Sequence, residues 1–327
     1  MIHLIIKDGL GNQMFQYAFA RCLQEHYRLN GCDEILSVNP YFINNRDFKD
    51  NDKREMSIQH LHLCDKILFQ SLSEQKMSIR NFKINTLLSM DLWTLIKWRF
   101  RNIKPMGEKE FIKRVANGIY YTFNAYTYYG FPLCYVKDKF VFGFFQNEKN
   151  FHCISEQIKK ELKVKDEPTE GNTKMIYHIQ SANSVCLHIR RGDYLNSKWK
   201  NLQICDFEYY NNSINYILDN VYNPLFFVFS NTHIDLEWIK ENYHFYDKSG
   251  NRPLKMVYVD LNNPDYEELR LMYSCKYFII SNSTFSWWAA YLSSYDNKIV
   301  LVPSRWNLSD KNDEAIYLKD WIKIGVR

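Results

Sequence analysis

The sequence predicts an α/β protein with two domains. Three observations support this: the chain has 327 residues, its start follows a strand–loop–helix pattern, and its second half alternates apolar runs with helical patterns. A chain of this length usually forms more than one core. Alternating strands and helices favour parallel sheets covered by helices on both faces. We place the domains at residues 1–165 and 175–327, with the polar segment 165–174 as the candidate linker.

The first predicted element is a short strand over residues 3–6. The turn-forming residues Asp8, Gly9, Gly11 and Asn12 follow it, and residues 14–23 then carry an apolar face at helical spacing. Parallel α/β proteins bind ligands at such strand-to-helix turns.

The segment from residue 44 to 150 has no regular pattern. Within it, residues 92–114 form a basic amphipathic stretch, for which a membrane-surface helix and a solvated helix face both stay open. Residues 115–136 carry no charge, but their asparagines and Pro132 favour strands and turns over a membrane span.

The segment after residue 175 is regular and predicts the elements of a parallel sheet. In the helix predicted over residues 264–275, Asn263 is the expected N-cap and Pro264 the first residue. The predicted strands are 184–189, 225–229, 256–259, 277–280 and 299–302, and the other predicted helices are 207–218, 236–242 and 284–292.

The composition excludes several functional classes. The formal charge of +5 is too small to indicate nucleic-acid binding, although it suits an anionic substrate or membrane. The eight cysteines are dispersed without a C-x-x-C pair, which favours reduced, buried thiols over a zinc site or a disulfide scaffold. Lys7 and Asp8 interrupt the apolar start too early for a signal peptide, so we expect a cytoplasmic location.

The motif H-I-R-R-G-D-Y occupies residues 188–194, directly after a predicted strand. It places His188, Arg190 and Arg191 at the carboxyl end of that strand, where sheet ligands bind. The arginine fork matches phosphate oxygens, and a departing nucleoside diphosphate needs its charge neutralised. The alternative is a surface loop whose arginines pair with acidic residues.

The motif S-N-S-T-F-S-W-W-A-A occupies residues 281–290, between a predicted strand and a predicted helix. The N–H groups of a helix start and the hydroxyls of Ser281, Ser283 and Thr284 can form an anion site. N-capping by Ser283 or Thr284 is the alternative, and it is compatible with anion binding. We expect Trp287 and Trp288 in the core.

The third motif, G-L-G-N-Q-M-F-Q-Y-A-F-A, occupies residues 9–20. Gly9 and Gly11 permit close backbone approach to a ligand. The motif is not G-x-G-x-x-G and it lacks the lysine of a P-loop.

In their order and spacing, these motifs resemble those of the bacterial galactoside α-1,2-fucosyltransferases, glycosyltransferase family 11, over about residues 3–305. The resemblance implies a GT-B fold, in which two Rossmann-like domains face each other across a cleft. It also implies GDP-fucose as donor, an inverting reaction, no required metal or other cofactor, and a terminal β-galactoside as acceptor.

The resemblance also implies roles for individual residues. Arg190 should contact the diphosphate, His188 should lie near the guanine or ribose, and Asp193 should organise the site, with Arg191 as its candidate partner. The donor pocket should include Asn282, Ser283, Thr284 and Phe285. Gly11, Asn12 and Gln13 should enter the cleft from the other domain, with Asn12 near the reacting carbon.

The segment 230–238, S-N-T-H-I-D-L-E-W, is about two residues longer than the family pattern. Either Asn231 or Asp235 could therefore touch the guanine. The general base also stays open between Asp193, Asp206, Glu208 and late proton loss to water. A D-x-D pattern at residues 50–52 is better explained as a solvated loop than as a metal site.

We therefore expect residues 1–165 to bind the acceptor and residues 175–327 to bind GDP-fucose. The acceptor would be a galactose-terminated glycan, lipid-linked or of polysaccharide or O-antigen type, used in the cytoplasm or at the inner face of the membrane. The alternatives are a glycosyltransferase with another nucleotide sugar, a non-catalytic carbohydrate-binding protein, suggested by the 17% aromatic content, and a peripheral membrane scaffold.

Overall fold

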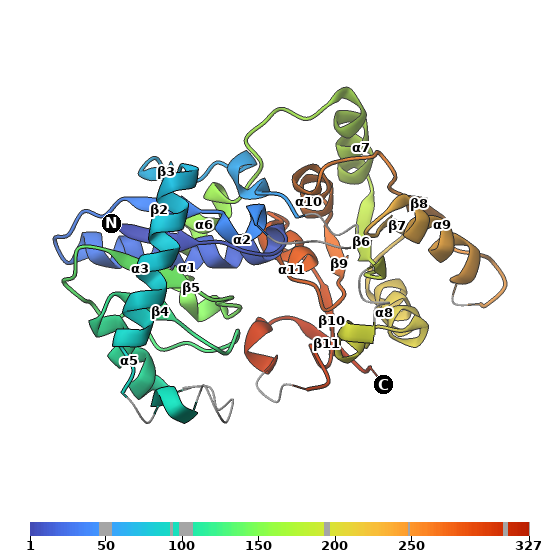
Figure 1. The fold of residues 1–327 in the computed structure, drawn as a ribbon. Coiled ribbons are helices and arrows are strands. Elements are labelled where there is room, and N and C mark those ends of the chain that lie inside the picture. Colours follow the sequence, from blue (N-terminus) through green and yellow to red (C-terminus); the bar gives the residue numbers. More distant parts are fainter. Residues whose placement is uncertain are drawn as a thin grey trace. The chain divides into compact units, whose positions relative to one another are not determined.

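The computed structural model describes residues 1–45, 54–91, 94–97, 107–192, 197–247, 249–309 and 313–326. The chain divides into two compact units, Met1–Leu162 (unit 1) and Lys163–Arg327 (unit 2). Each unit contains its own parallel sheet (Figure 1). Two sheets of this kind confirm the predicted α/β class with two Rossmann-like domains.

The sheet of unit 1 has five strands in the order β3-β2-β1-β5-β4, and every pair is parallel. The chain adds β2 and β3 on one side of β1 and then places β5 on the other side. The strand order therefore reverses between β1 and β5. The strands are β1 (Ile2–Ile5), β2 (Leu36–Asn39), β3 (Ile67–Phe69), β4 (Ile119–Tyr121) and β5 (Lys139–Phe142).

Helix α1 (Leu10–Leu29) is the central helix of unit 1 and is mostly buried. It begins earlier than predicted, because the Gly9 carbonyl accepts hydrogen bonds from the N–H groups of Asn12 (2.9 Å) and Gln13 (3.1 Å). Gly11 and Asn12 thus lie in its first turn, and the prediction of a longer turn is wrong. The other helices are α2 (Tyr41–Asn44), α3 (Leu72–Leu88), α5 (Glu108–Ala116) and α6 (Ser155–Glu161).

The uncharged segment 115–136 forms the end of α5, strand β4 and the loops beside it. It buries Tyr120 and Tyr126 in unit 1, whereas Tyr128 and Tyr135 are exposed. The Tyr120 hydroxyl lies 2.9 Å from that of Tyr27 on α1. Arg114, at the end of the predicted basic stretch, is buried as well, and its Nε donates to the Tyr121 carbonyl at 3.1 Å. Neither a membrane surface nor a solvated face fits Arg114. Residues 92, 93 and 98–106 of that stretch lie outside the described residues.

The sheet of unit 2 has six strands in the order β11-β10-β9-β6-β7-β8, again with parallel pairing throughout. β7 and β8 extend it on one side of β6, whereas β9, β10 and β11 extend it on the other. The strand order reverses between β6 and β9. The strands are β6 (Asn183–His188), β7 (Pro224–Phe229), β8 (Met256–Tyr258), β9 (Tyr277–Ile279), β10 (Val300–Pro303) and β11 (Ile322–Ile324).

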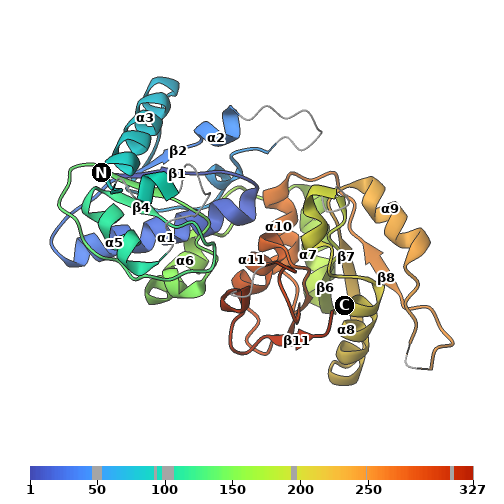
Figure 2. The same ribbon diagram turned by 60° about the horizontal axis from the view of Figure 1, so that its bottom comes forward.

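The helices of unit 2 cover both faces of this sheet (Figure 2). α8 (Phe207–Asn220) and α9 (His233–Asn242) pack on one face through a cluster that includes Tyr209, Ile239 and Val185. α7 (Glu170–Ser181), α10 (Asp265–Tyr273) and α11 (Thr284–Leu292) lie on the other face. Trp287 and Trp288 of α11 are fully buried, which confirms their predicted place in the core.

Two boundary predictions in unit 2 are wrong. The candidate linker 165–174 includes the first turn of α7, because the Thr169 side chain accepts a hydrogen bond from the Asn172 N–H and caps the helix. Pro264, not Asn263, occupies the N-cap position of α10. Asn263 instead exchanges amide hydrogen bonds with Asn172, at 2.9 and 3.1 Å, and so connects the start of α10 to α7.

The remaining regular elements are short 3₁₀ helices at Ser57–His60, Glu148–Asn150, His152–Ile154, Ser197–Leu202 and Asp313–Ile316. All eight cysteines are free, and Cys153 is exposed, contrary to the prediction that the thiols are buried.

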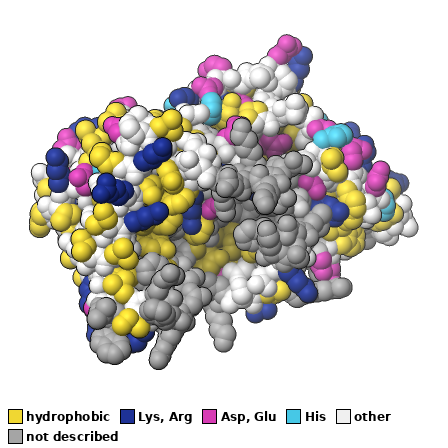
Figure 3. Space-filling model, in the orientation of Figure 1, with side chains coloured by type: hydrophobic (Ala, Val, Ile, Leu, Met, Phe, Trp, Pro, Cys, Tyr) yellow, Lys and Arg dark blue, Asp and Glu magenta, His cyan; other side chains and the backbone are white. Residues whose placement is uncertain are grey.

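No helix in the described part of the chain combines the length and apolarity needed to cross a bilayer. The surface in Figure 3 mixes hydrophobic with basic side chains, and α3 exposes Leu72, Met77, Leu87 and Leu88.

Candidate functional site

The point of reversed strand order in unit 2 brings two of the sequence motifs together. β6 ends at His188, and β9 ends two residues before Ser281. The His188 Nδ1 and the Ser281 Oγ lie 3.0 Å apart and form a hydrogen bond. In open parallel sheets, ligands bind outside the carboxyl ends of the strands at such a reversal. This edge of unit 2 is the candidate site.

His188 is buried, with 3% of its surface exposed, and its ring lies 6.2 Å from that of Phe285. Burial, reinforced by the positive charge of Arg190, lowers the pKa of His188 to about 3. The imidazole is therefore neutral at pH 7, and it can orient a neighbouring group without adding a charge.

The first turn of α11 presents backbone N–H groups at this edge. Ser283 occupies the N-cap position, but its side chain forms no capping hydrogen bond with the described residues, so the predicted capping role fails for Ser283. Ser283 is buried, whereas Thr284 and Phe285 are half-buried. The uncapped N–H groups of a helix start carry partial positive charge and can bind a phosphate.

Asn282 lies under the site and not at its surface. It is 2% exposed, and its Nδ2 donates to the carbonyls of Leu202 (2.9 Å) and Trp306 (3.0 Å). Its amide thus fixes the loop between β9 and α11. The predicted contact of Asn282 with the donor stays a prediction.

Arg190 is held by the loop after β7. When the Asn231 amide is turned so that its oxygen faces the guanidinium, this oxygen accepts hydrogen bonds from Arg190 Nη1 (3.0 Å) and Nε (3.2 Å). Gly192 permits this approach, because its φ is +23° and a Cβ atom there would lie 3.0 Å from the Asn231 Cγ. The two strand-end loops therefore support each other.

Arg191 is held by helix α9. Its guanidinium stacks 3.3 Å from the centre of the Trp238 ring, and its Nε lies 3.7 Å from the Asp235 carboxylate. Asp235 also accepts a hydrogen bond from the Gly192 N–H at 3.3 Å. The sequence prediction missed Trp238, because no spacing in the chain connects it to the arginine motif. α9 also begins earlier than predicted, since Thr232 caps it through the Asp235 N–H.

The candidates for a general base are only partly described. Asp193 lies outside the described residues, as does the D-x-D pattern at residues 50–52. Asp206 is the N-cap of α8 and accepts a hydrogen bond from the Tyr209 N–H at 3.0 Å. Glu208, in the first turn of α8, is exposed.

Unit 1 has its own reversal of strand order, between β1 and β5. There the Asn12 Oδ1, in the first turn of α1, accepts a hydrogen bond from the Gln146 Nε2 at 2.8 Å. Gln146 comes shortly after β5, and no sequence signal pointed to it. Asn12 is half-buried, and Gly11 is buried.

Gln13 orders the loops of unit 1. Its Nε2 donates to the carbonyls of Asp8 (2.9 Å) and Glu55 (2.7 Å), and its Oε1 accepts from the Ile58 N–H at 3.2 Å. The side chain is fully buried. Its amide is thus used internally, and a contact with a ligand stays a prediction.

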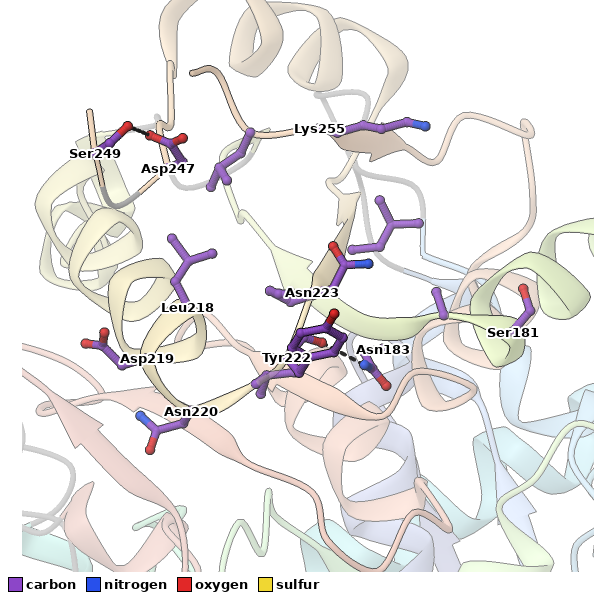
Figure 4. A pocket seen from close by; sticks show the side chains of 15 residues that line it. Ser181, Asn183, Leu218, Asp219, Asn220, Tyr222, Asn223, Asp247, Ser249 and Lys255 are labelled. Atoms are coloured by element: carbon purple, nitrogen blue, oxygen red, sulfur yellow. Dashed lines mark hydrogen bonds between the residues drawn. The ribbon is translucent and has the colours of Figure 1, made fainter. Parts of the chain in front are cut away.

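A different concavity, of about 1230 Å³, lies at the amino-terminal edge of the unit 2 sheet (Figure 4). It is lined by the ends of α7 and α8, the start of β7, the carboxylates of Asp219 and Asp247, and the cationic Lys255. Helix C-termini and carboxylates repel an anion. None of the predicted site residues lines it.

Among the described residues, no group of His, Cys, Asp and Glu side chains could hold a metal ion.

Comparison with known proteins agrees with the motifs. The family model described as "Glycosyl transferase family 11" matches residues 1–325. The chain is 27% identical to the O-antigen biosynthesis glycosyltransferase WbnK of Escherichia coli, over 98% of this chain and 99% of that protein. It is 29% identical to an α-1,2-colitosyltransferase of E. coli, over 92% and 90%. The fucosyltransferase NodZ from Bradyrhizobium superposes with a TM-score of 0.46 at 9% identity, over 88% of this chain and 91% of that one.

Proposed function

Because this chain belongs to glycosyl transferase family 11, and is thus a glycosyltransferase, we propose that it transfers L-fucose from GDP-fucose to a glycan. The acceptor atom is the 2-hydroxyl of a terminal β-galactoside, and the reaction inverts the anomeric carbon without a metal ion. The observation that carries the proposal is the anion-binding edge of unit 2, where the His188–Ser281 hydrogen bond connects the arginine loop to the start of α11.

The donor diphosphate binds at this edge. Breaking the bond between the sugar and the diphosphate builds negative charge on the leaving oxygen, and that charge must be neutralised. Arg190, held by Asn231, supplies a charge-assisted hydrogen bond. The N–H groups at the start of α11 supply a second, fixed source of positive potential. The neutral His188 connects the arginine loop to the start of α11 through its hydrogen bond with Ser281.

The acceptor hydroxyl attacks from the face of the sugar opposite to the departing diphosphate. Asn12, positioned by Gln146, acts near the reacting carbon. Asp193 is our first candidate for the base that removes the hydroxyl proton, ahead of Asp206 and Glu208. Asp193→Asn should then lower kcat on the order of 10²-fold or more, as removal of a general base does. A near-normal kcat for transfer would exclude this role.

The relatives support both the linkage and one alternative. The α-1,2-colitosyltransferase of E. coli is named for the α-1,2 transfer of colitose, a sugar other than fucose. A nucleotide sugar different from GDP-fucose is therefore the second candidate for the donor. The name of WbnK supports an O-antigen glycan as the acceptor, bound by unit 1.

Transfer from GDP-fucose to lactose, with and without EDTA and followed by product mass, tests the proposal. A fucosylated product formed equally well in EDTA is the expected result. Transfer that stops in EDTA would contradict the metal-free mechanism. If GDP neither inhibits the enzyme nor stabilises it against heat, while UDP does, the donor assignment is wrong.

A further inference from the structure

The carboxyl group of Glu268 lies near the candidate site, in the first turn of α10. This helix follows β8 and leads to β9, so its first residues begin where the parallel strands end. Burial, the neighbouring Cys275 and the charge of Glu268 raise the pKa of the Cys186 thiol on β6, and the charge of Asp260, in the loop after β8, contributes to the raised pKa of Glu268. Cys186 and His188 are two residues apart on β6 and point to the same face of the sheet. Glu268 therefore lies over the face that carries His188.

The Glu268 carboxyl has no hydrogen-bond or ion-pair partner in the part of the chain that the structure describes. The adjacent Glu267 differs in this respect. Its carboxylate accepts a hydrogen bond from the Asn172 Nδ2 at 2.9 Å and pairs with Arg270 at 3.1 Å. Glu267 therefore holds α10 to α7, whereas Glu268 is available to a ligand.

The surroundings of Glu268 are unfavourable for a charge. Burial, together with the nearby Asp260 and Asp265, raises the pKa of Glu268 to about 8. A desolvated carboxyl group without a partner costs stability. Such a group is typical of a binding site, where a ligand provides the missing hydrogen-bond donors.

The two residues that the sequence suggested for the guanine are already engaged. The Asn231 oxygen faces Arg190, and the Asp235 carboxylate binds the Gly192 N–H and lies beside Arg191. Their side chains hold the phosphate-binding arginines. These contacts favour a different side chain at this edge for recognition of the base.

We propose that Glu268 recognises the guanine of the donor, an inference that rests on the proposed function. Hydrogen bonds from a bound guanine favour the ionised form of Glu268 and so lower its pKa again. The carboxylate then accepts one hydrogen bond from the N1–H of guanine and one from its 2-amino group. Guanine presents these two donors side by side, as a carboxylate requires. Uracil places carbonyl oxygens on both sides of its single N–H, and adenine presents an acceptor at N1, so both bases fit this carboxylate poorly.

Calorimetric titration of the full-length chain with GDP, IDP and UDP tests this role. IDP lacks only the 2-amino group, so it removes one of the two proposed hydrogen bonds. The variant Glu268→Gln keeps the side-chain shape but replaces one acceptor oxygen with a donor. Glu241→Gln, which changes an exposed carboxylate on α9, is the matched control. The melting temperature without nucleotide verifies that each variant is folded.

The wild type and the control should bind GDP at least about tenfold more tightly than IDP or UDP. Glu268→Gln should bind GDP at least about tenfold more weakly and lose the preference over IDP, with an unchanged or higher melting temperature. A folded variant that keeps the preference would overturn the role of Glu268 and leave the proposed donor intact. If the wild type bound GDP and IDP equally well, that result alone would overturn the role of Glu268. Tighter binding of UDP than of GDP would reject the proposed function as well.

Discussion

The imidazole of His188 and the hydroxyl of Ser281 form a buried hydrogen bond of 3.0 Å between Nδ1 and Oγ. The two residues are far apart in the chain, and they meet because β6 and β9 are neighbours in the sheet. The bond fixes the start of the arginine loop relative to the loop that opens α11. The distance between Arg190 and the helix start is therefore set before a ligand binds, which favours binding of a diphosphate.

The burial of His188 makes the stability of the protein depend on pH. Its pKa is about 3 in the folded state, compared with 6.5 for the exposed group. Below pH 6.5 the unfolded chain binds a proton that the folded chain does not, so the stability contributed at neutral pH is lost as the pH falls toward 3. Between pH 7 and pH 5 this loss is on the order of 2 kcal/mol.

Urea unfolding of the wild type and of His188→Gln at pH 7 and pH 5 measures this effect. The wild type should lose more free energy of unfolding than the variant over this range, because glutamine does not titrate. An equal loss in both proteins would show that His188 is not held in its neutral form.

Arg190→Ala should lower kcat/KM for GDP-fucose. The variant loses the proposed charge-assisted contact with the diphosphate, which corresponds to about 2–4 kcal/mol of transition-state stabilisation. Steady-state kinetics with varied GDP-fucose measures the change. Arg252→Ala, which removes an exposed arginine, is the control. A decrease of less than about threefold for Arg190→Ala would show that the diphosphate binds elsewhere.

Gly192→Ala should impair the same step without removing a functional group. Its φ of +23° disfavours a side chain, and the added Cβ would lie 3.0 Å from the Asn231 Cγ, against the side chain that holds Arg190. We expect weaker GDP binding, by about tenfold, with the chain still folded. Gly250→Ala is a control, because it also has a positive φ but no atom within 4 Å of an added Cβ. Equal GDP affinity in the two variants would contradict the role of the Asn231 contact.

Asn12→Ala tests whether unit 1 contributes to the transfer step and not to nucleotide binding. The proposed function assigns the donor nucleotide to unit 2, so this variant should keep the Kd for GDP within about twofold while its kcat for transfer falls on the order of 10²-fold. Titration with GDP and transfer kinetics on the same preparation provide both values. A large loss of GDP affinity would place Asn12 in the nucleotide site instead.

The sequence predicted unit 2 better than unit 1 for a physical reason. The strands of unit 2 are apolar runs between amphipathic helices, so their limits follow from composition, and α11 was predicted with its observed limits. In unit 1, β4 has only three residues, and phenylalanines of the nearby loops, Phe131 and Phe145, pack on Phe19 of α1. Such packing has no period along the chain.

The errors at helix ends have a similar origin. Gly9 and Gly11 resemble a turn, yet the Gly9 carbonyl begins α1. Pro168 and Gly171 resemble a linker, yet the cap at Thr169 begins α7 nearby. The hydrogen bonds at these helix starts are local contacts that composition does not reveal.

For the site, the motifs predicted which strand ends carry the chemistry but not how the side chains are used. The sequence placed His188 and Ser281 each at or after the end of a predicted strand, and the structure shows that the two side chains meet. The contacts that hold Arg190 and Arg191, by Asn231 and Trp238, connect separate loops and have no signature in the sequence. Glu268 has no signature in the sequence either, because a carboxyl group without a partner is recognised only when its surroundings in the fold are known.

Hydrogen–deuterium exchange with and without GDP tests the central claim most directly, namely that the donor nucleotide binds where β6 and β9 end. We predict that GDP protects the peptides covering residues 188–192 and 281–286, and leaves the segment 219–224 at the opposite edge of the sheet unchanged. Protection confined to the segment 219–224, or to peptides of unit 1, would contradict the account.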